Sequence, residues 1–434
     1  MKTKYFLFGM ALAATLSSCK KDCDKDPVET EKPCTAWGKL LGGTHTDLAN
    51  AGVKTPDGGY LVVGSTQSND GDVSGYHGGI DILVFKVDKD GVKVWQKAFG
   101  GSGQDIANAV IAAPDGGYVI AGYTMSSNGD VVGRHGEQDA WILKINEVGT
   151  ILWQKAWGGT RNEMAFAAAA AADGYVVAIG SASTDGDLPA TNTHTNTWLV
   201  KFNTNGTIGW QKPVGVDNVY NVPSNLIATT GGYVVVGSTG NGTGADARVV
   251  KTSTTGDIIW EKTFSGTDQD EFSGITESAD GGYLLTGFTA SNDGDIIGNT
   301  RGDFDVLAVK VNSNGGKEWL KIYEGSGVDG LNKTSVAKTV DGQYMVAAFS
   351  SGNGTDAGTN HGGADAWILK LNASGVKVGQ KLLGGTENDY VGQLIKANDC
   401  GYLLIGSSFS NNGDVSGNHS NGFSDVWLFK INDF

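Results

Sequence analysis

Short apolar segments separated by turn signals follow one another along most of the chain. In one representative stretch the apolar runs cover residues 108–113, 118–123, 139–145 and 151–156. Pro-Asp-Gly, a long polar loop and an Asn-x-x-Gly sequence separate them, and such runs bounded by turn residues are typical of β-strands. The second and third runs are apolar at nearly every position, so we expect both of their faces to be buried. The fourth run carries Gln and Lys, as a water-facing edge strand does.

This four-strand pattern recurs seven times. Each copy contains W-x-K-x-x-G-G, an acidic residue, a D-G-G-Y-like turn, a long polar loop and a D-x-x-l-x-K run. The tyrosines of the D-G-G-Y-like motif recur at intervals of 50 to 61 residues and are Tyr60, Tyr118, Tyr175, Tyr233, Tyr283, Tyr344 and Tyr402. Seven repeats of a four-stranded unit predict an all-β, seven-bladed β-propeller of antiparallel blades.

The two ends of the repeat array predict how the ring closes. The seventh repeat stops at Phe434, directly after its third strand at residues 425–431. Residues 37–43, W-G-K-L-L-G-G, form a fourth strand without a repeat of its own. We therefore predict a propeller over residues 37–434 whose N-terminal strand completes the last blade and removes an open sheet edge. Residues 167–172, an alanine run with helical propensity, take the register of a first strand in this scheme.

The first 36 residues follow a different pattern. Lys2 and Lys4 precede an apolar run at residues 5–16, which ends in L-S-S-C at Cys19. This pattern predicts a signal peptide over residues 1–18. It resembles the bacterial lipobox, and the resemblance implies that Cys19 is lipidated and anchors the chain to a membrane. Residues 19–36 are polar and predict a flexible tether.

The C-K-K-D sequence at the start of this tether resembles lipoproteins of Bacteroidota, many of which reach the outer membrane or the cell surface. The resemblance implies a lipid-anchored protein of the bacterial cell envelope, placed at the outer membrane.

Composition narrows the function classes. The 434 residues include 67 Gly and carry a net charge of −15. So acidic a surface repels phosphate backbones, which argues against nucleic acid as a partner, and we expect a monomer. Cys23 and Cys34 either form a disulfide or remain unpaired, and Cys400 lies alone in a turn. No C-x-x-C spacing indicates a zinc site.

The long loops and the loops that precede each first strand should lie on one face, which we call the loop face. Function concentrates on such variable loops. One acid precedes each first strand in six repeats, and Tyr220 takes this place in the fourth. We expect these acids to circle one mouth of the central channel as a candidate ligand-binding ring: Asp47, Asp105, Glu163, Asp270, Asp329 and Asp389. The alternative is that each carboxylate accepts backbone hydrogen bonds within its own loop.

Two further sets of polar residues occur in these loops. N/D-G-D sequences supply oxygen atoms that could hold calcium, and the candidates are Asp70, Asp72, Asp293 and Asp295. Asx turns explain the same sequences without a metal, and we predict no cofactor. All six histidines also fall in loop-face segments, where we interpret them as braces of the loops: His45, His77, His135, His194, His361 and His419.

Two repeated positions in the strands have structural interpretations. An acid opens the third strand in six repeats and Asn196 replaces it in the other, so we expect a hydrogen-bonded cap. Tryptophans share one fourth-strand position and are predicted packing anchors: Trp95, Trp153, Trp210, Trp260 and Trp319.

The repeated phrases resemble the Gly-rich D-G-G-Y repeat propellers of Bacteroidota lipoproteins, over residues 37–434. The strand three-to-four phrase, as in K-I-N-E-V-G-T-I-L-W at residues 144–153, also resembles quinoprotein-type propellers. No repeat-breaking acid or histidine, G-x-S-x-G, H-E-x-x-H or phosphate loop stands out.

We therefore expect a non-catalytic, lipid-anchored binding or scaffold module that uses its loop face for protein or glycan. The alternatives are a carbohydrate-active enzyme, which requires a pair of carboxylates, and an outer-membrane assembly factor.

Overall fold

The computed structural model describes residues 35–188, 196–215, 219–240, 244–299, 303–325, 327–331, 333–353, 356–419 and 422–434. Within these residues, 28 strands form seven four-stranded antiparallel sheets, the blades of a seven-bladed β-propeller. We number the blades 1 to 7 in chain order. None of the described segments is a helix that is long and apolar enough to cross a membrane.

The four strands of a blade are ordered from the ring centre outward. The innermost strands are β2 (Asp47–Lys54), β6 (Asp105–Ala112), β10 (Glu163–Ala171), β14 (Tyr220–Thr229), β18 (Asp270–Glu277), β22 (Ser335–Lys338) and β26 (Asp389–Lys396). The second strands are β3 (Tyr60–Thr66), β7 (Tyr118–Thr124), β11 (Gly174–Ser181), β15 (Gly232–Gly240), β19 (Tyr283–Thr289), β23 (Tyr344–Ser350) and β27 (Tyr402–Ser408). The third strands are β4 (Asp81–Val87), β8 (Asp139–Ile145), β12 (Asn196–Asn203), β16 (Ala245–Ser253), β20 (Asp305–Val311), β24 (Asp365–Leu371) and β28 (Asp425–Ile431). The outermost strands are β5 (Lys93–Phe99), β9 (Ile151–Trp157), β13 (Ile208–Pro213), β17 (Ile258–Phe264), β21 (Lys317–Tyr323), β25 (Lys377–Leu383) and β1 (Trp37–Leu41).

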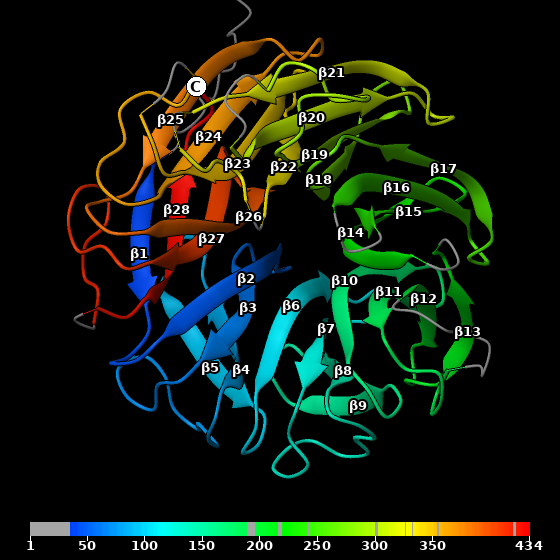
Figure 1. Ribbon diagram of the computed structural model, residues 1–434. Coiled ribbons are helices and arrows are strands. Elements are labelled where there is room, and N and C mark those ends of the chain that lie inside the picture. Colours follow the sequence, from blue (N-terminus) through cyan, green and yellow to red (C-terminus); the bar gives the residue numbers. More distant parts are fainter. Residues whose placement is uncertain are drawn as a thin grey trace, which may run out of the picture. The chain divides into compact units, whose positions relative to one another are not determined.

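The innermost strands form the wall of the ring centre. Each contacts the innermost strand of the next blade, and β26 of blade 7 contacts β2 of blade 1 (Figure 1). The ring is closed by β1, which pairs with β28 in antiparallel register from Trp37 opposite Lys430 to Leu41 opposite Val426. The predicted closure is confirmed. Pairing of β1 also covers an edge of β28 that would otherwise present unpaired backbone groups.

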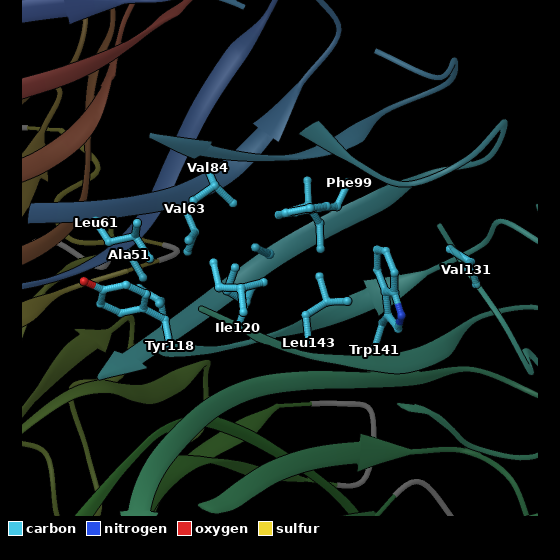
Figure 2. Close-up of a cluster of buried hydrophobic side chains, with 14 of the residues drawn as sticks. Ala51, Leu61, Val63, Val84, Phe99, Tyr118, Ile120, Val131, Trp141 and Leu143 are labelled. Carbon is cyan, nitrogen blue, oxygen red and sulfur yellow. The ribbon is translucent and has the colours of Figure 1, made fainter. Parts of the chain in front are cut away.

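The hydrophobic core lies between neighbouring blades. Every residue of β3 and β4 is buried, as their uninterrupted apolar runs predicted. Figure 2 shows Leu61 and Val63 of blade 1 beside Tyr118, Ile120 and Leu143 of blade 2. Side chains on both faces of a blade therefore take part in packing, so the blades depend on one another for burial.

Tryptophans of the outermost strands attach blades to the next blade, except in blade 6, where Gly379 takes this position. A side-chain atom placed on Gly149, in the β8–β9 turn, would lie 3.0 Å from the ring of Trp95 in the preceding blade. Gly149 also has a φ of +78°, which favours glycine. The same arrangement joins Trp260 to Gly315, and the Trp260 indole donates a hydrogen bond to the Ser313 carbonyl (3.0 Å). The prediction that these tryptophans are packing anchors is confirmed.

Lysines of the third strands hold the D-G-G-Y-like turns in five of the seven blades. Lys310 is 4% exposed and its ammonium lies 2.9 Å from Asp280 of the β18–β19 turn. Similar pairs join Lys86 to Asp57 and Lys144 to Asp115. The hydrogen bond from Lys86 lowers the pKa of Asp57 to about 2. The recurring lysine and the recurring turn aspartate are therefore the two partners of one ion pair that supports the turn.

The largest difference between predicted and observed strand boundaries in blade 2 is at the start of its first strand. The first strand of blade 2 begins at Asp105, three residues before the apolar run, because the Asp105 amide donates to the Ile80 carbonyl and Asp105 pairs with Thr124. The alanine run at residues 167–172 falls largely within β10 and is a first strand, as predicted from its register.

Candidate functional site

Five acids of the predicted ligand-binding ring occupy the first position of the innermost strands, and the sixth, Asp329, lies before β22 in an isolated bridge with Ser350. Asp47, Asp105, Glu163, Asp270, Asp329 and Asp389 are all 0% exposed. Asp47 shows their bonding. It accepts hydrogen bonds from the Gly43 amide (2.7 Å), the Thr66 hydroxyl (2.5 Å) and the Ser68 hydroxyl (2.9 Å). These bonds fix the loop before β2 and the loop after β3, so the carboxylate caps its own blade. A role in ligand binding stays a prediction.

Blade 4 requires a correction to the repeat alignment. Tyr220 was placed in the series of first-strand acids, but the structure places Asn221 there. Asn221 is 0% exposed and pairs with Thr239, as Asp47 pairs with Thr66. β14 begins one residue early at Tyr220, whose side chain is 52% exposed. The extra residue shifted the alignment by one position.

Each first-strand acid lies close to the third-strand acid of the preceding blade. An atom placed on Gly100 would lie 2.6 Å from a carboxylate oxygen of Asp105 and 2.6 Å from one of Asp81. A side chain at position 100 would collide with both carboxylates, so glycine is required there. The Asp305 carboxyl of blade 5 likewise faces Asp329 of blade 6.

Burial raises the pKa of several of these carboxyls. Desolvation raises the pKa of Asp47, Asp270 and Asp329 to about 6. Desolvation, with the nearby charge of Asp329, raises that of Asp305 to about 7. Several third-strand acids keep one buried oxygen without a hydrogen-bond partner in the described structure, for example Oδ1 of Asp81. Two charged carboxylates this close together repel each other, so we expect proton uptake at pairs whose pKa is raised, such as Asp305 and Asp329.

The boundary between blades 3 and 4 carries amides in both positions. Asn196 and Asn221 both lie beside Gly215, in the place that two carboxyls take elsewhere. Both members of the pair are neutral, which removes the charge repulsion but retains polar groups of similar size. This paired replacement shows that two amides can take the place of the two carboxyls, so the fold does not require an acid at this position.

The calcium candidates lie in hydrogen-bonded loop caps. Asp70 accepts bonds from the amide (2.8 Å) and the hydroxyl (2.7 Å) of Thr44. Asp72 forms an ion pair with Lys93 at 2.6 Å. Asp293 accepts a bond from the Thr267 amide at 2.8 Å, and Asp295 one from the Ser265 amide at 3.3 Å. Within the described ranges no group of three or more His, Cys, Asp or Glu side chains is arranged to hold a metal. Calcium binding stays a prediction.

Four histidines brace the long loops against the third strands. The Nδ1 atoms of His77 and His135 lie 2.9 and 3.0 Å from the carboxylates of Asp81 and Asp139. His361 and His419 contact Asp365 and Asp425 in the same way. His194 lies outside the described residues.

The N-terminal predictions also concern residues outside the described ranges. These are the signal peptide, the lipidated Cys19, most of the tether, and Cys23 and Cys34. Cys400, in the β26–β27 turn, is disulfide-bonded, so the expectation that it lies alone is wrong. The local turn sequence does not indicate this bond.

Sequence reasoning also missed one repeat-breaking acid, Glu271 in β18. The corresponding residue in blade 1 is the apolar Leu48. The Glu271 carboxylate accepts a hydrogen bond from the Ser224 hydroxyl at 2.5 Å, and burial raises its pKa. Its hydrogen-bond partners are serines of β14 and β15. Among its described contacts, Glu271 therefore does not form the pair of carboxylates that a glycosidase needs.

Sequence reasoning also missed a concavity on the loop face. It has a volume of about 550 Å³ and lies at the seam between blades 7 and 1, where the ring closes. We call it the seam concavity, and its lining residues are His45, Gln67, Asn69, Asp70, Tyr76 and Phe423.

Aromatic and polar groups converge in the seam concavity. The rings of His45 and Phe423 lie 5.8 Å apart between centroids, and the Phe423 side chain is 44% exposed. The Tyr76 hydroxyl donates a bond to the Gly79 carbonyl at 2.7 Å, which fixes its ring beside the recess. Gln67 and Asn69 add exposed side-chain amides. No repeat motif marks these residues, because they come from three loops of two different blades.

Comparisons with known proteins assign no family to this chain. No family model matches the chain, and no curated protein matches it. Among solved structures, a protein of unknown function from Bacteroides caccae is 14% identical, with 66% of this chain and 83% of that chain covered and a TM-score of 0.38. The WD40 propeller domain of Doa1 is 14% identical over 90% of this chain and 96% of that one, with a TM-score of 0.48. A protein of unknown function from Dyadobacter fermentans is 12% identical over 91% and 98% of the two chains, with a TM-score of 0.45.

Proposed function

We propose that this β-propeller is a non-catalytic binding module of the bacterial cell envelope, that lipid on Cys19 anchors it to the outer membrane, and that it binds glycan through the seam concavity. The carrying observation is the convergence of exposed aromatic rings and side-chain amides in one recess of the loop face. Ligand sites combine an apolar or aromatic wall with a few polar groups that fix orientation. A sugar ring offers both a C–H face that stacks on aromatic rings and hydroxyls that bond to amides.

Charge restricts the class of glycan. The chain carries a net charge of −15, and Asp70 lies in the wall of the concavity. Like charges repel an anionic polysaccharide at moderate salt. Neutral or amino-substituted glycans are therefore the expected ligands, and acidic ones are excluded from this site.

A glycan array tests the binding proposal, with affinities of the hits measured by calorimetry. Phe423→Ala and Tyr76→Ala each remove an aromatic wall, so we expect about tenfold weaker binding or more. Tyr220→Ala is the matched control, because Tyr220 is an exposed aromatic residue at blade 4. Unchanged affinity in the Phe423→Ala, Tyr76→Ala double variant would refute binding at the seam, and glycan cleavage would refute the non-catalytic assignment.

Anchoring has a separate test. Cells grown with a clickable fatty acid should label the wild-type protein and leave Cys19→Ser unlabelled. Label retained on Cys19→Ser would show that Cys19 is not the lipidated residue.

A further inference from the structure

A second cavity lies at the ring centre, away from the seam. It has a volume of about 190 Å³, and its wall includes residues of all seven innermost strands. At about 30 Å³ per molecule, this volume holds roughly six waters or a ligand of a few non-hydrogen atoms. Most of its polar lining is neutral, including Asn108, Asn225 and Gln393.

Lys333 is the one charged side chain among the described residues of this wall. Blade 6 has seven residues from Asp329 to Ser335 where blade 1 has five from Asp47 to Ala51, since Ser335 and Ala51 take the same place opposite the second strand. The added length places Lys333 in the channel. The other blades present neutral bulge residues there, such as Asn50.

The ammonium of Lys333 reaches across blade 7. Its Nζ donates to the Asn50 carbonyl of blade 1 at 2.8 Å. A side-chain atom placed on Gly392 of blade 7 would lie 3.0 Å from the same carbonyl oxygen. Because Gly392 has no side chain, the Lys333 ammonium has room to reach this oxygen. An ammonium has three protons to donate, and this bond is the one that Lys333 makes within the described structure.

No carboxylate of the described residues neutralises this ammonium. It takes part in no ion pair there, and desolvation lowers the pKa of Lys333 to about 8. Glu271 does not line the cavity, although it bonds to the lining residue Ser224, and burial raises its pKa and so suppresses its charge. A partly buried ammonium in a channel without a counter-charge costs free energy that an anion would recover.

We propose that the channel around Lys333 is a binding site for a small carboxylate anion. The ammonium supplies the counter-charge, and neutral amides such as that of Gln393 supply further donors from the wall. The size of the cavity limits the ligand to a small organic acid or to the terminal carboxylate of a larger one.

Nuclear magnetic resonance of the ¹³C-dimethylated protein tests this site, with malonate as the probe and sodium chloride of equal ionic strength as the control. The Lys333 resonance, identified by its loss in Lys333→Met, should titrate near 8 in chloride. Malonate should raise that midpoint, because an anion stabilises the charged amine. Calorimetry should show binding weakened about tenfold or more in Lys333→Met. Lys338→Met, which changes an exposed lysine of β22, should bind as wild type.

Two outcomes would overturn the proposal. One is a Lys333 midpoint that malonate leaves unchanged. The other is equal malonate affinity in wild type and Lys333→Met, which would make Lys333 only a brace between blades 6 and 1. Lys333→Arg keeps the positive charge, so it should restore malonate binding if Lys333→Met folds poorly.

Discussion

Buried carboxyls meet between neighbouring blades because the repeat places one at the start of each first strand and another at the start of each third strand. Asp47 and Asp425 form one such pair, and Asp305 and Asp329 another. Each carboxyl is 1% exposed or less. Their hydrogen bonds fix the loops, whereas their mutual repulsion opposes folding when both are charged. At the same residues, hydrogen bonding therefore stabilises the fold and charge repulsion destabilises it.

These raised pKa values predict how stability depends on pH. A carboxyl whose pKa is higher in the folded state binds its proton more tightly there, so it stabilises the fold at low pH. That contribution is lost as the pH rises through about 6 for Asp47 and about 7 for Asp305. We expect the free energy of unfolding in urea to be higher at pH 5.5 than at pH 8. Equal values at the two pH values would contradict this.

The neutral pair of Asn196 and Asn221 suggests a matched substitution. Replacing both Asp305 and Asp329 with Asn should remove their repulsion and raise the free energy of unfolding at pH 8 by about 1–2 kcal/mol. At pH 5.5 the gain should shrink, because the wild-type pair is then partly protonated. Urea titrations at both pH values measure it, and a loss of stability at pH 8 would show that charge is needed there.

At the scale of single elements, the contact between a fourth-strand tryptophan and the next blade's turn explains why two repeated motifs occur together. The Trp260 ring lies against Gly315 and bonds to the Ser313 carbonyl. The tryptophan and the glycine turn are more than fifty residues apart, yet each requires the other. Their recurrence in one order along the chain reflects the blade-to-blade packing.

Trp260→Ala should therefore destabilise the protein by about 3 kcal/mol, through lost packing and a lost hydrogen bond. Ile259→Ala is the control, because Ile259 on the same strand is 56% exposed and should change stability little. Thermal unfolding followed by circular dichroism compares the two variants. Similar melting temperatures would mean that the tryptophan contributes no more than surface residues do.

The Cys400 disulfide adds a covalent constraint to the β26–β27 turn. Loss of a disulfide removes a restriction on the unfolded chain, which typically costs a few kcal/mol. Cys400→Ser should lower the melting temperature, and a reducing agent should lower that of the wild type but not that of the variant. An equal response of both proteins to reduction would show that this bond does not form in solution.

For the whole molecule, closure of the ring follows from where the repeat array starts and stops. Residues 37–41 pair with β28, so the first and last segments of the array share a blade. Leu40 and Leu41 of β1 are buried in two different inter-blade clusters. Deletion of residues 37–41 should expose the edge of β28 and lower the melting temperature, with aggregation visible by size-exclusion chromatography. A monomer of unchanged stability would contradict the closure mechanism.

The fold was predictable because the same local sequence pattern occurs in all seven repeats. The period, the turn glycines and the unmatched W-G-K-L-L-G-G strand together specify blade number and closure. The site was less predictable. Tyr220 was misplaced because one added residue shifts a register that only strand pairing reveals. Lys333 and the seam concavity escaped notice because they depend on insertions and on loops of different blades, which periodicity cannot indicate.

The most direct test of the proposed function is hydrogen–deuterium exchange with and without the strongest glycan found on the array. Binding at the seam should slow exchange in the loops that carry Gln67, Tyr76 and Phe423, and leave equivalent loops of blades 2 and 5 unchanged. Protection confined to another part of the ring, or to none, would contradict the proposal that the seam concavity is the binding site.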